Sequence, residues 1–393
     1  MIKDEISALA KELFEKVIQH RRYLHRHPEL SFQEHNTAAY VAGELSRMGL
    51  SPVRVADTGV VAHIAGKDGD RVVALRADMD ALPITEQNEV DYRSENPGVM
   101  HACGHDVHTA SLLGVAELLT RMKDEFSGTV KLIFQPGEEK LPGGATLMIK
   151  EGVLEDPRPQ SILGQHVYPE LEAGKVGFKA GKYMASADEV YLTVEGKGGH
   201  AAMPHLLNDP VFAAANIITS LQQVISRRAN PVVPSVLSFG KVLAHGATNV
   251  VPSEVFIEGT FRTFDEDWRN NAIALIEEIA KTTAAACGVK CKVDIKKGYP
   301  HLHNDERLTI KMQGWATEML GAENVVDLDY RMTAEDFSFY THIVPGCFYR
   351  LGTRSGANGR IESLHNPNFD IDERALFTGV QLMSFLCIKQ LNT

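Results

Sequence analysis

The sequence lacks a long apolar run, a surplus of basic residues and a paired set of cysteines. No apolar stretch approaches the roughly 18 residues that are needed to cross a bilayer. The first residues, MIKDEISALAKELFEK, carry a charge every few positions and show no apolar core of a signal peptide. With 40 Lys and Arg against 51 Asp and Glu, the net charge is −11, which argues against nucleic acid as the main partner. We therefore expect a cytoplasmic protein that binds neither membranes nor nucleic acid.

The cysteines are five in number and scattered along the chain, which does not predict a disulfide framework and fits a reducing compartment. One of them lies in an unusual stretch, MHACGHDVH (100–108), together with three histidines and an aspartate. From its neighbours alone, Cys103 could be a metal ligand, a nucleophile or a small buried residue.

At 393 residues the chain is too long for one ordinary core, so we expect two domains. Its first half contains four β-rich runs that are nearly continuous in Val, Ile and Leu. A helical pattern lies between the second and the third of these runs. Such runs indicate strands that are covered on both faces, and hence an α/β layer architecture. The predicted strands are 60–64, 72–77, 129–135 and 161–166.

The pattern changes near residue 184. Here the strands alternate apolar and polar side chains, as in a sheet with one face in solvent, and two helices interleave with them in the β-α-β-β-α-β order of a ferredoxin-like motif. From about 297 the chain returns to mixed α/β. We predict a mixed-sheet α/β catalytic domain (1–183 and 297–393) interrupted by an α+β ferredoxin-like lid or dimerisation domain (184–296).

Side chains that can bind metal ions or transfer protons follow the predicted strands. Asp78 and Asp80 follow the strand 72–77, Glu138 and Glu139 follow 129–135, and His166 ends 161–166. Because ligands of open α/β sheets bind beyond the carboxyl ends of strands, we expect these side chains to converge on one rim.

The loop with Cys103 and His105 would join this rim, and His365 in SLHNP adds a distant histidine. Thiolate, imidazole and carboxylate together suit Zn²⁺ and similar ions, and a bridging group can hold two ions. Of the adjacent glutamates, one could bind metal while the other moves a proton.

Each residue also has a plain structural interpretation. Cys103 could be a buried hydrophobe, His166 a hydrogen-bonded core histidine, and Glu138 and Glu139 a solvated surface pair. Asp78 and Asp80 could cap backbone amides. Only the convergence of these residues favours a metal site.

The ordered motifs resemble the M20 metallopeptidases, specifically the amidohydrolase branch with hippurate hydrolase, auxin-conjugate hydrolases and N-acetyldiaminopimelate deacetylase. The resemblance runs nearly end to end. It is carried by RRYLHRHPELSFQE (21–34), RADMDALPI (76–84), MHACGHDVHTA (100–110), LIFQPGEE (132–139), GQHVYPE (164–170), GKGGHAAMPH (196–205), ATNVVP (247–252), GTFRTF (259–264), TAEDFSFY (333–340) and LHNPNFDIDE (364–373).

This resemblance implies two divalent metal ions per subunit, Zn²⁺ or Mn²⁺, with Ni²⁺ or Co²⁺ as further candidates. Cys103 would bridge them, His105 and His166 would complete one site, and Glu139 and His365 the other. Glu138 would be the general base and later the acid.

The resemblance also implies that His200 stabilises the oxyanion, in the family often from the partner subunit of a homodimer or larger homo-oligomer. Asn249 and Arg262 would hold the substrate carboxylate or the tetrahedral intermediate.

One departure favours the amidohydrolase branch. Many M20 enzymes take a metal histidine from a His-x-Asp motif on the strand that here reads Arg76-Ala77-Asp78, and His105 replaces it. The implied activity is hydrolysis of small N-acyl amino acids, with dipeptidase or carboxypeptidase action as the alternative.

Two readings from other classes stay open. They are a cysteine-nucleophile hydrolase, and a binding protein that has lost turnover. The acyl group is not readable from the sequence, and we expect residues 300–360, including the loop GTRSGANGR (352–360), to select it.

Overall fold

The computed structural model describes residues 2–356 and 361–393, which form two compact units with separate hydrophobic cores. The larger unit contains the residues up to Tyr183 together with His303–Asp329 and Asp336–Thr393. The smaller unit contains Met184–Leu302 and Tyr330–Glu335. The predicted fold class, a mixed-sheet α/β domain interrupted by an α+β segment with its own sheet, is confirmed.

The larger unit is built on an eight-stranded mixed sheet with the order β1-β2-β4-β3-β5-β16-β6-β15. β3 runs parallel to both β4 and β5, and β5 runs parallel to β16. β2 is antiparallel to β4. The strands are β1 (Val53–Val55), β2 (Gly59–Ala65), β3 (Lys67–Asp78), β4 (Ser127–Gln135), β5 (Ser161–Glu172), β6 (Val176–Phe178), β15 (Val325–Asp327) and β16 (Gly346–Arg354).

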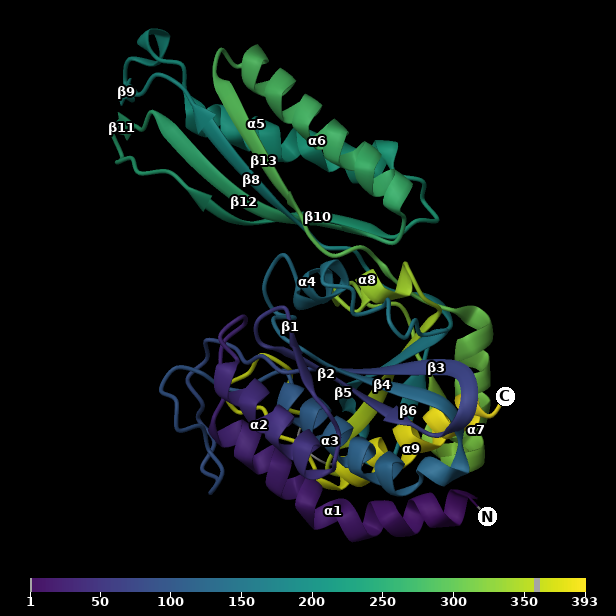
Figure 1. Cartoon of the computed structure of the whole chain (residues 1–393). Coiled ribbons are helices and arrows are strands. Elements are labelled where there is room, and N and C mark those ends of the chain that lie inside the picture. Colours follow the sequence, from purple (N-terminus) through teal and green to yellow (C-terminus); the bar gives the residue numbers. More distant parts are fainter. Residues whose placement is uncertain (1, 357–360) are drawn as a thin grey trace. The chain divides into compact units, whose positions relative to one another are not determined.

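Helices α1, α3 and α9 pack against one another on one side of this sheet (Figure 1). Helix α3 is apolar nearly all round because the sheet and the two other helices enclose it, and its buried polar side chains gather in its first turns. The helices of this unit are α1 (Ile2–Arg26), α2 (His35–Arg47), α3 (His105–Arg121), α4 (Gly144–Lys150), α7 (Glu306–Leu320), α8 (Ser338–Thr341) and α9 (Arg374–Leu391), with short 3-10 turns η1 (Lys123–Glu125) and η4 (Ala322–Asn324).

The strand that carries His166 is longer than the sequence indicated. We predicted that it ends at His166, but β5 continues to Glu172, because the segment YPELE keeps pairing with β16 as far as Arg354. His166 therefore lies within the strand, opposite Arg350 of β16. Beside this sheet, β7 (Gly181–Met184) pairs with β14 (Leu302–Asn304) in a separate two-stranded sheet.

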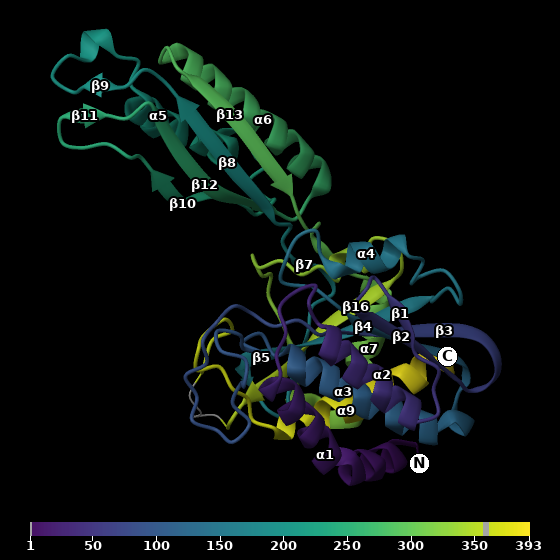
Figure 2. The same ribbon diagram turned by 60° about the vertical axis from the view of Figure 1, so that its left-hand side comes forward.

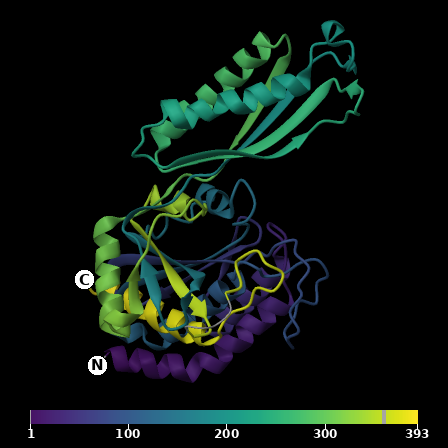
Figure 3. The same cartoon turned by 180° about the vertical axis from the view of Figure 1, so that it is seen from behind.

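The smaller unit is a four-stranded antiparallel sheet with the order β10-β12-β8-β13 (Figure 2). Helices α5 and α6 pack on one face of it (Figure 3). Asp209 and Asp265 cap these helices by accepting first-turn N–H groups. The elements are β8 (Asp188–Glu195), β9 (Gly199–His200), η2 (Pro204–Leu206), α5 (Pro210–Gln223), the π-helical turn η3 (Val224–Arg228), β10 (Ser235–Leu243), β11 (Val250–Val251), β12 (Glu254–Thr263), α6 (Glu266–Ala286) and β13 (Lys290–Lys297).

Among the described residues, no helix combines the length and the apolar character that a membrane span requires.

Gly104 joins the cysteine loop to helix α3, and its conformation generates a testable prediction. Its backbone is left-handed (φ 82°), and a Cβ atom there would lie 2.4 Å from Cγ2 of Val167. We expect Gly104→Ala to lower the free energy of unfolding by about 1–3 kcal/mol through backbone strain and overpacking. The measurement is urea unfolding of the metal-free protein.

Gly43→Ala is the matched control. Gly43 lies inside α2 with open space around its Cα, so alanine should raise stability by about 0.5–1 kcal/mol. Gly104→Ala with wild-type stability would contradict the predicted strain.

Candidate metal centre

The candidate site lies at the edge of the large sheet where side chains of β3, of β5 and of the loop after β4 come together. β3 ends at Asp78, and the loop after β4 carries Glu138 and Glu139. Because β3 and β4 run parallel in adjacent positions, their carboxyl ends meet at one edge, as predicted. His166 joins them from β5 on the other side of β3.

The cysteine loop and a distant loop complete the cluster. Cys103 precedes α3, and His105 is the first residue of that helix. His365, on the loop before α9, donates its backbone N–H to the carbonyl of Ala102 at 2.8 Å, which ties the two loops together. His365 has a left-handed backbone (φ 62°), a strained conformation that occurs preferentially at functional sites.

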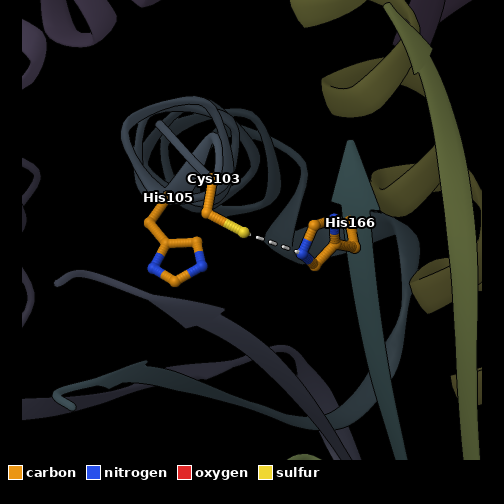
Figure 4. A group of neighbouring side chains, drawn as sticks. All are labelled: Cys103, His105 and His166. Carbon is orange, nitrogen blue, oxygen red and sulfur yellow. Dashed lines mark hydrogen bonds between the residues drawn. The ribbon is translucent and has the colours of Figure 1, made fainter. Parts of the chain in front are cut away.

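Among the described residues, possible metal-donor atoms form five overlapping groups, each with its atoms within 4.8 Å of one another, and three of the groups consist entirely of predicted site residues. The Cys103 sulfur points toward His166, with Sγ 3.6 Å from Nε2 (Figure 4). These three groups are Cys103 with His105 and His166, Cys103 with Glu139 and His365, and His105 with Glu138 and Glu139. The other two are Asp78 with His105 and His108, and Glu138 with Glu335 and Asp336. All five predicted ligands and Glu138 are thus brought together, while their ligand roles stay a prediction.

The electrostatics of this cluster favour a bound cation. Burial raises the pKa of the Cys103 thiol far above its ordinary value, and the carboxylates of Glu139 and Glu138 raise it further. Burial also lowers the pKa of His166, which keeps that imidazole neutral. For His105, burial lowers the pKa, but Asp78 and Asp80 outweigh it and raise the pKa to about 10. A buried site with so many acidic groups attracts positive charge.

The hydrogen bonding of the buried His105 ring shows whether the donor atoms fit a metal ion. His105 Nδ1 lies 2.9 Å from the carbonyl oxygen and 3.1 Å from Oδ1 of Asp80, and both are acceptors, so Nδ1 keeps its hydrogen when a metal ion displaces the proton on Nε2. Nε2 is buried and has no hydrogen-bond partner. Metal-ligating histidines have this arrangement, with one nitrogen held by a carboxylate and the other left for the ion. The residues present therefore fit divalent metal ions.

The other half of the site is more open. Glu139 Oε1 lies 3.1 Å from Nε2 of His365, whose side chain is 53% exposed. Glu138 is buried, and its Oε1 accepts the backbone N–H of Asp336 at 3.4 Å. The two adjacent glutamates therefore have different partners, as expected for neighbours with different tasks.

Three predicted residues belong to the smaller unit. His200 and Asn249 adjoin on the β9–β11 ribbon, where Ala201 donates its N–H to the Asn249 carbonyl, and both side chains are exposed. Arg262 on β12 is half-buried and donates to the Thr260 hydroxyl (3.2 Å) and the Met332 carbonyl (3.3 Å). Within the described residues, Arg262 forms no ion pair with a carboxylate.

The residues that support the proposed ligands were not predicted from the sequence. His108 donates from Nδ1 to Asp78 (2.6 Å) and accepts the N–H of Val167 at Nε2 (2.9 Å), which fixes the backbone beside His166. Arg76 is buried and pairs with Asp78 and Asp336. His108 belongs to the histidine-rich stretch 100–108, and Asp78 follows a predicted strand. The sequence therefore showed both residues, but it did not show which residues they contact.

One predicted specificity segment is only partly described. In the loop GTRSGANGR, Gly352–Arg354 belong to β16, and residues 357–360 lie outside the described part of the chain.

Comparison with known proteins identifies the family. Residues 74–389 match the family model for peptidase family M20/M25/M40. An N-acyl-L-amino acid amidohydrolase of Geobacillus stearothermophilus is 44% identical over 308 residues, covering 78% of this chain and 83% of the relative. An N-acetyl-L-cysteine deacetylase of Bacillus subtilis is 39% identical over 377 residues, covering 95% and 88%.

A solved structure supports the same assignment. A dinuclear metal-binding peptidase of family M20 from Bacillus subtilis superposes with a TM-score of 0.83 at 36% identity, covering 97% of this chain and 99% of that one. The chain belongs to peptidase family M20/M25/M40 and is a metallo-amidohydrolase of that family.

Proposed function

We propose that the chain hydrolyses the amide bond of N-acyl amino acids, which releases a carboxylate and a free amino acid. The observation that carries this proposal is the pair of donor groups that share Cys103, with the carboxylate of Glu138 beside them. The amidohydrolase and deacetylase names of the relatives agree with this substrate class. Peptide hydrolysis at the same site is the second candidate, since the superposed dinuclear protein is a peptidase.

We propose that two divalent ions share Cys103, one held with His105 and His166, the other with Glu139 and His365. Bound there, the ions would lower the pKa of water and polarise the amide carbonyl. Zn²⁺ and Mn²⁺ are the first candidates, and Ni²⁺ and Co²⁺ also suit a mixed thiolate, imidazole and carboxylate set.

Glu138 moves the proton in this proposal. Its carboxylate takes the proton from the attacking water and later delivers it to the amide nitrogen, so that the amine leaves neutral. The adjacent Glu139 is paired with His365, so the two glutamates differ in their partners, as a ligand and a proton carrier would.

His200 is proposed as the donor to the oxyanion. Ala202 donates its backbone N–H to Nδ1 of His200 at 3.1 Å, so the neutral ring carries its hydrogen on Nε2. The exposed imidazole therefore presents an N–H donor, the group that an oxyanion needs.

Arg262 and Asn249 are proposed to bind the substrate carboxylate. Since the hydrogen-bond partners of Arg262 among the described residues are neutral, its planar guanidinium can take a carboxylate in two parallel bonds.

The cysteine-nucleophile alternative meets an electrostatic obstacle. A nucleophilic cysteine needs a lowered thiol pKa, whereas burial and neighbouring carboxylates raise the pKa of Cys103. A bound cation would reverse this by stabilising the thiolate.

We also propose a homodimer and a cytoplasmic location. β10 pairs with a strand on one side only, and Val236, Val242 and Leu243 on it are exposed. An unpaired edge with apolar side chains is suited to pairing with a second copy.

Exchanging the proposed base tests its role. Glu138→Gln keeps the size and removes the proton acceptor, so we expect turnover to fall by about 10²–10⁴-fold with two ions still bound. Glu139→Gln is the matched neighbour and should lose metal. Turnover and metal content of both purified variants are measured. Loss of metal from Glu138→Gln would make Glu138 a ligand and refute its assignment as base.

A metal-exchange assay tests the reaction itself. Metal-stripped protein receives Zn²⁺, Mn²⁺, Co²⁺ or Ni²⁺, and release of free amino acid is measured from N-acetyl, N-benzoyl and N-indoleacetyl amino acids and from dipeptides. We expect metal-dependent turnover that is higher on N-acyl amino acids than on dipeptides. Chelator-resistant turnover that is lost on alkylation would contradict the proposal in favour of a cysteine nucleophile. Substrate binding without turnover under any ion would favour a binding protein.

Sedimentation of the full chain tests the dimer. We expect a dimer at micromolar concentration, since the apolar side chains of β10 would be covered. A monomer with full activity would contradict both the dimer and any action of His200 across subunits.

A further inference from the structure

Asp336 is a fully buried aspartate just before α8, and the proposed mechanism gives it no role. Its carboxylate accepts hydrogen bonds from three other segments of the larger unit. Oδ1 accepts from Nη2 of Arg76 on β3 (2.7 Å) and from Nε2 of Gln135 on β4 (2.9 Å). Oδ2 accepts from the same amide of Gln135 (2.8 Å) and from the backbone N–H of Ala145 in α4 (3.0 Å).

Two of these donors lie at the two ends of one loop. Gln135 is the last residue of β4, and Ala145 lies in the first turn of α4. Residues 136–143 between them form the loop that carries the two adjacent glutamates. The loop folds back closely on itself, because a Cβ atom on Gly144 would lie 1.7 Å from the carbonyl oxygen of Pro136. The carboxylate of Asp336 therefore holds both ends of a tight loop together.

The backbone of Asp336 also contacts the proposed base. Its N–H donates to Oε1 of Glu138 at 3.4 Å. Helix α8, which begins two residues later, packs against α4 (Figure 1). One residue thus binds the ends of the loop through its carboxylate and the base within the loop through its peptide group. A shift of Asp336 would move the carboxylate of Glu138 with it.

We propose that Asp336 is a positioning residue for the general base, because it sets the conformation of the loop after β4 and directs the carboxylate of Glu138. This inference rests on the proposed function, in which Glu138 carries the proton. Asp336 contacts no reacting atom there. A base must lie within hydrogen-bonding reach of the proton that it takes, so a displacement of about 1 Å can lower the rate by about 10²-fold.

The position requires two acceptor oxygens, which asparagine cannot supply. In Asp336→Asn, an amide nitrogen in place of Oδ2 would face the N–H of Ala145, and in place of Oδ1 it would face the guanidinium of Arg76. Gln135 cannot compensate by turning its own amide, because its Oε1 accepts Nε of Arg76 at 2.9 Å. Every orientation of the asparagine therefore leaves one donor facing another.

Lys131 provides a control for general destabilisation. It lies on β4, as Gln135 does, is 1% exposed, and donates from Nζ to the carbonyl of Val153 at 2.8 Å. Lys131→Met removes this buried hydrogen bond and leaves every contact of Asp336 in place. We expect it to lower the stability of the fold while kcat and KM stay within about threefold of the wild type.

The experiment measures kcat and KM for an N-acyl amino acid at saturating metal, together with the metal content, in the wild-type chain, Asp336→Asn and Lys131→Met. We expect Asp336→Asn to lower kcat by about 10–100-fold with two ions bound, since the base is displaced. KM should stay within about threefold, because Asp336 is not proposed to contact the substrate. Wild-type kcat in Asp336→Asn would overturn the inference.

A double-variant cycle separates positioning of the base from a general effect on the fold. If Asp336 acts through Glu138, adding Asp336→Asn to Glu138→Gln should lower turnover by less than about threefold, because the base is already absent. A purely structural role would lower turnover by the same factor in both backgrounds. Equal factors would therefore overturn the inference.

Gln135→Met keeps the test decisive if Asp336→Asn does not fold. It removes the contact at the start of the loop and leaves Asp336 paired with Arg76 and Ala145, so we expect kcat to fall by roughly three- to tenfold. Unchanged kcat in Gln135→Met would then overturn the inference. A wild-type chain without metal-dependent turnover, or Glu138→Gln with wild-type turnover, would instead refute the proposed function, which distinguishes the two failures.

Discussion

The burial of acidic and thiol groups at one edge of the large sheet is the constraint on which the rest of the site depends. Cys103, Asp78 and Asp80 are enclosed by the protein, and Glu138 lies beside them. Burial of like charges is unfavourable unless positive charge is close by. Arg76 supplies part of that charge to Asp78, and the raised pKa of His105 reflects the same demand. Two divalent ions would balance the buried negative charge more fully and would stabilise the Cys103 thiolate.

The partner of one ring nitrogen decides what each histidine can do. In His105, Nδ1 donates to Asp80, so the buried Nε2 is the nitrogen that can exchange its proton for an ion. In His200, Nδ1 accepts from a backbone N–H, so the exposed Nε2 becomes a donor. In the proposed mechanism the same type of side chain thus serves as a ligand in the larger unit and as an oxyanion donor in the smaller one.

Much of the candidate donor cluster could be predicted, because strand ends are read from local sequence patterns. Apolar runs followed by Asp78 or by Glu138 and Glu139 are visible in the sequence, and parallel neighbours bring their ends together. His166 lies in the donor cluster, but the prediction that it ends its strand was wrong, since pairing with β16 is not a local property.

The supporting contacts could not be predicted because they join distant segments. Arg76 and Asp336 are 260 positions apart, and the bond from His365 to Ala102 depends on two loops. For Asp80, capping of backbone amides was among the interpretations that the sequence allowed. Which amides it binds, and that it also holds His105, depends on the register of α3 against the loop after β4.

X-ray absorption at the metal edge of the Zn²⁺-loaded chain tests the central claim most directly, because it reports the ligand atoms and any second ion. The account predicts a sulfur ligand at about 2.3 Å, nitrogen and oxygen ligands near 2.0–2.1 Å, and a second metal about 3.5–4 Å away. A spectrum with nitrogen and oxygen ligands alone, or with one isolated ion and no metal neighbour, would contradict a Cys103-bridged pair of ions.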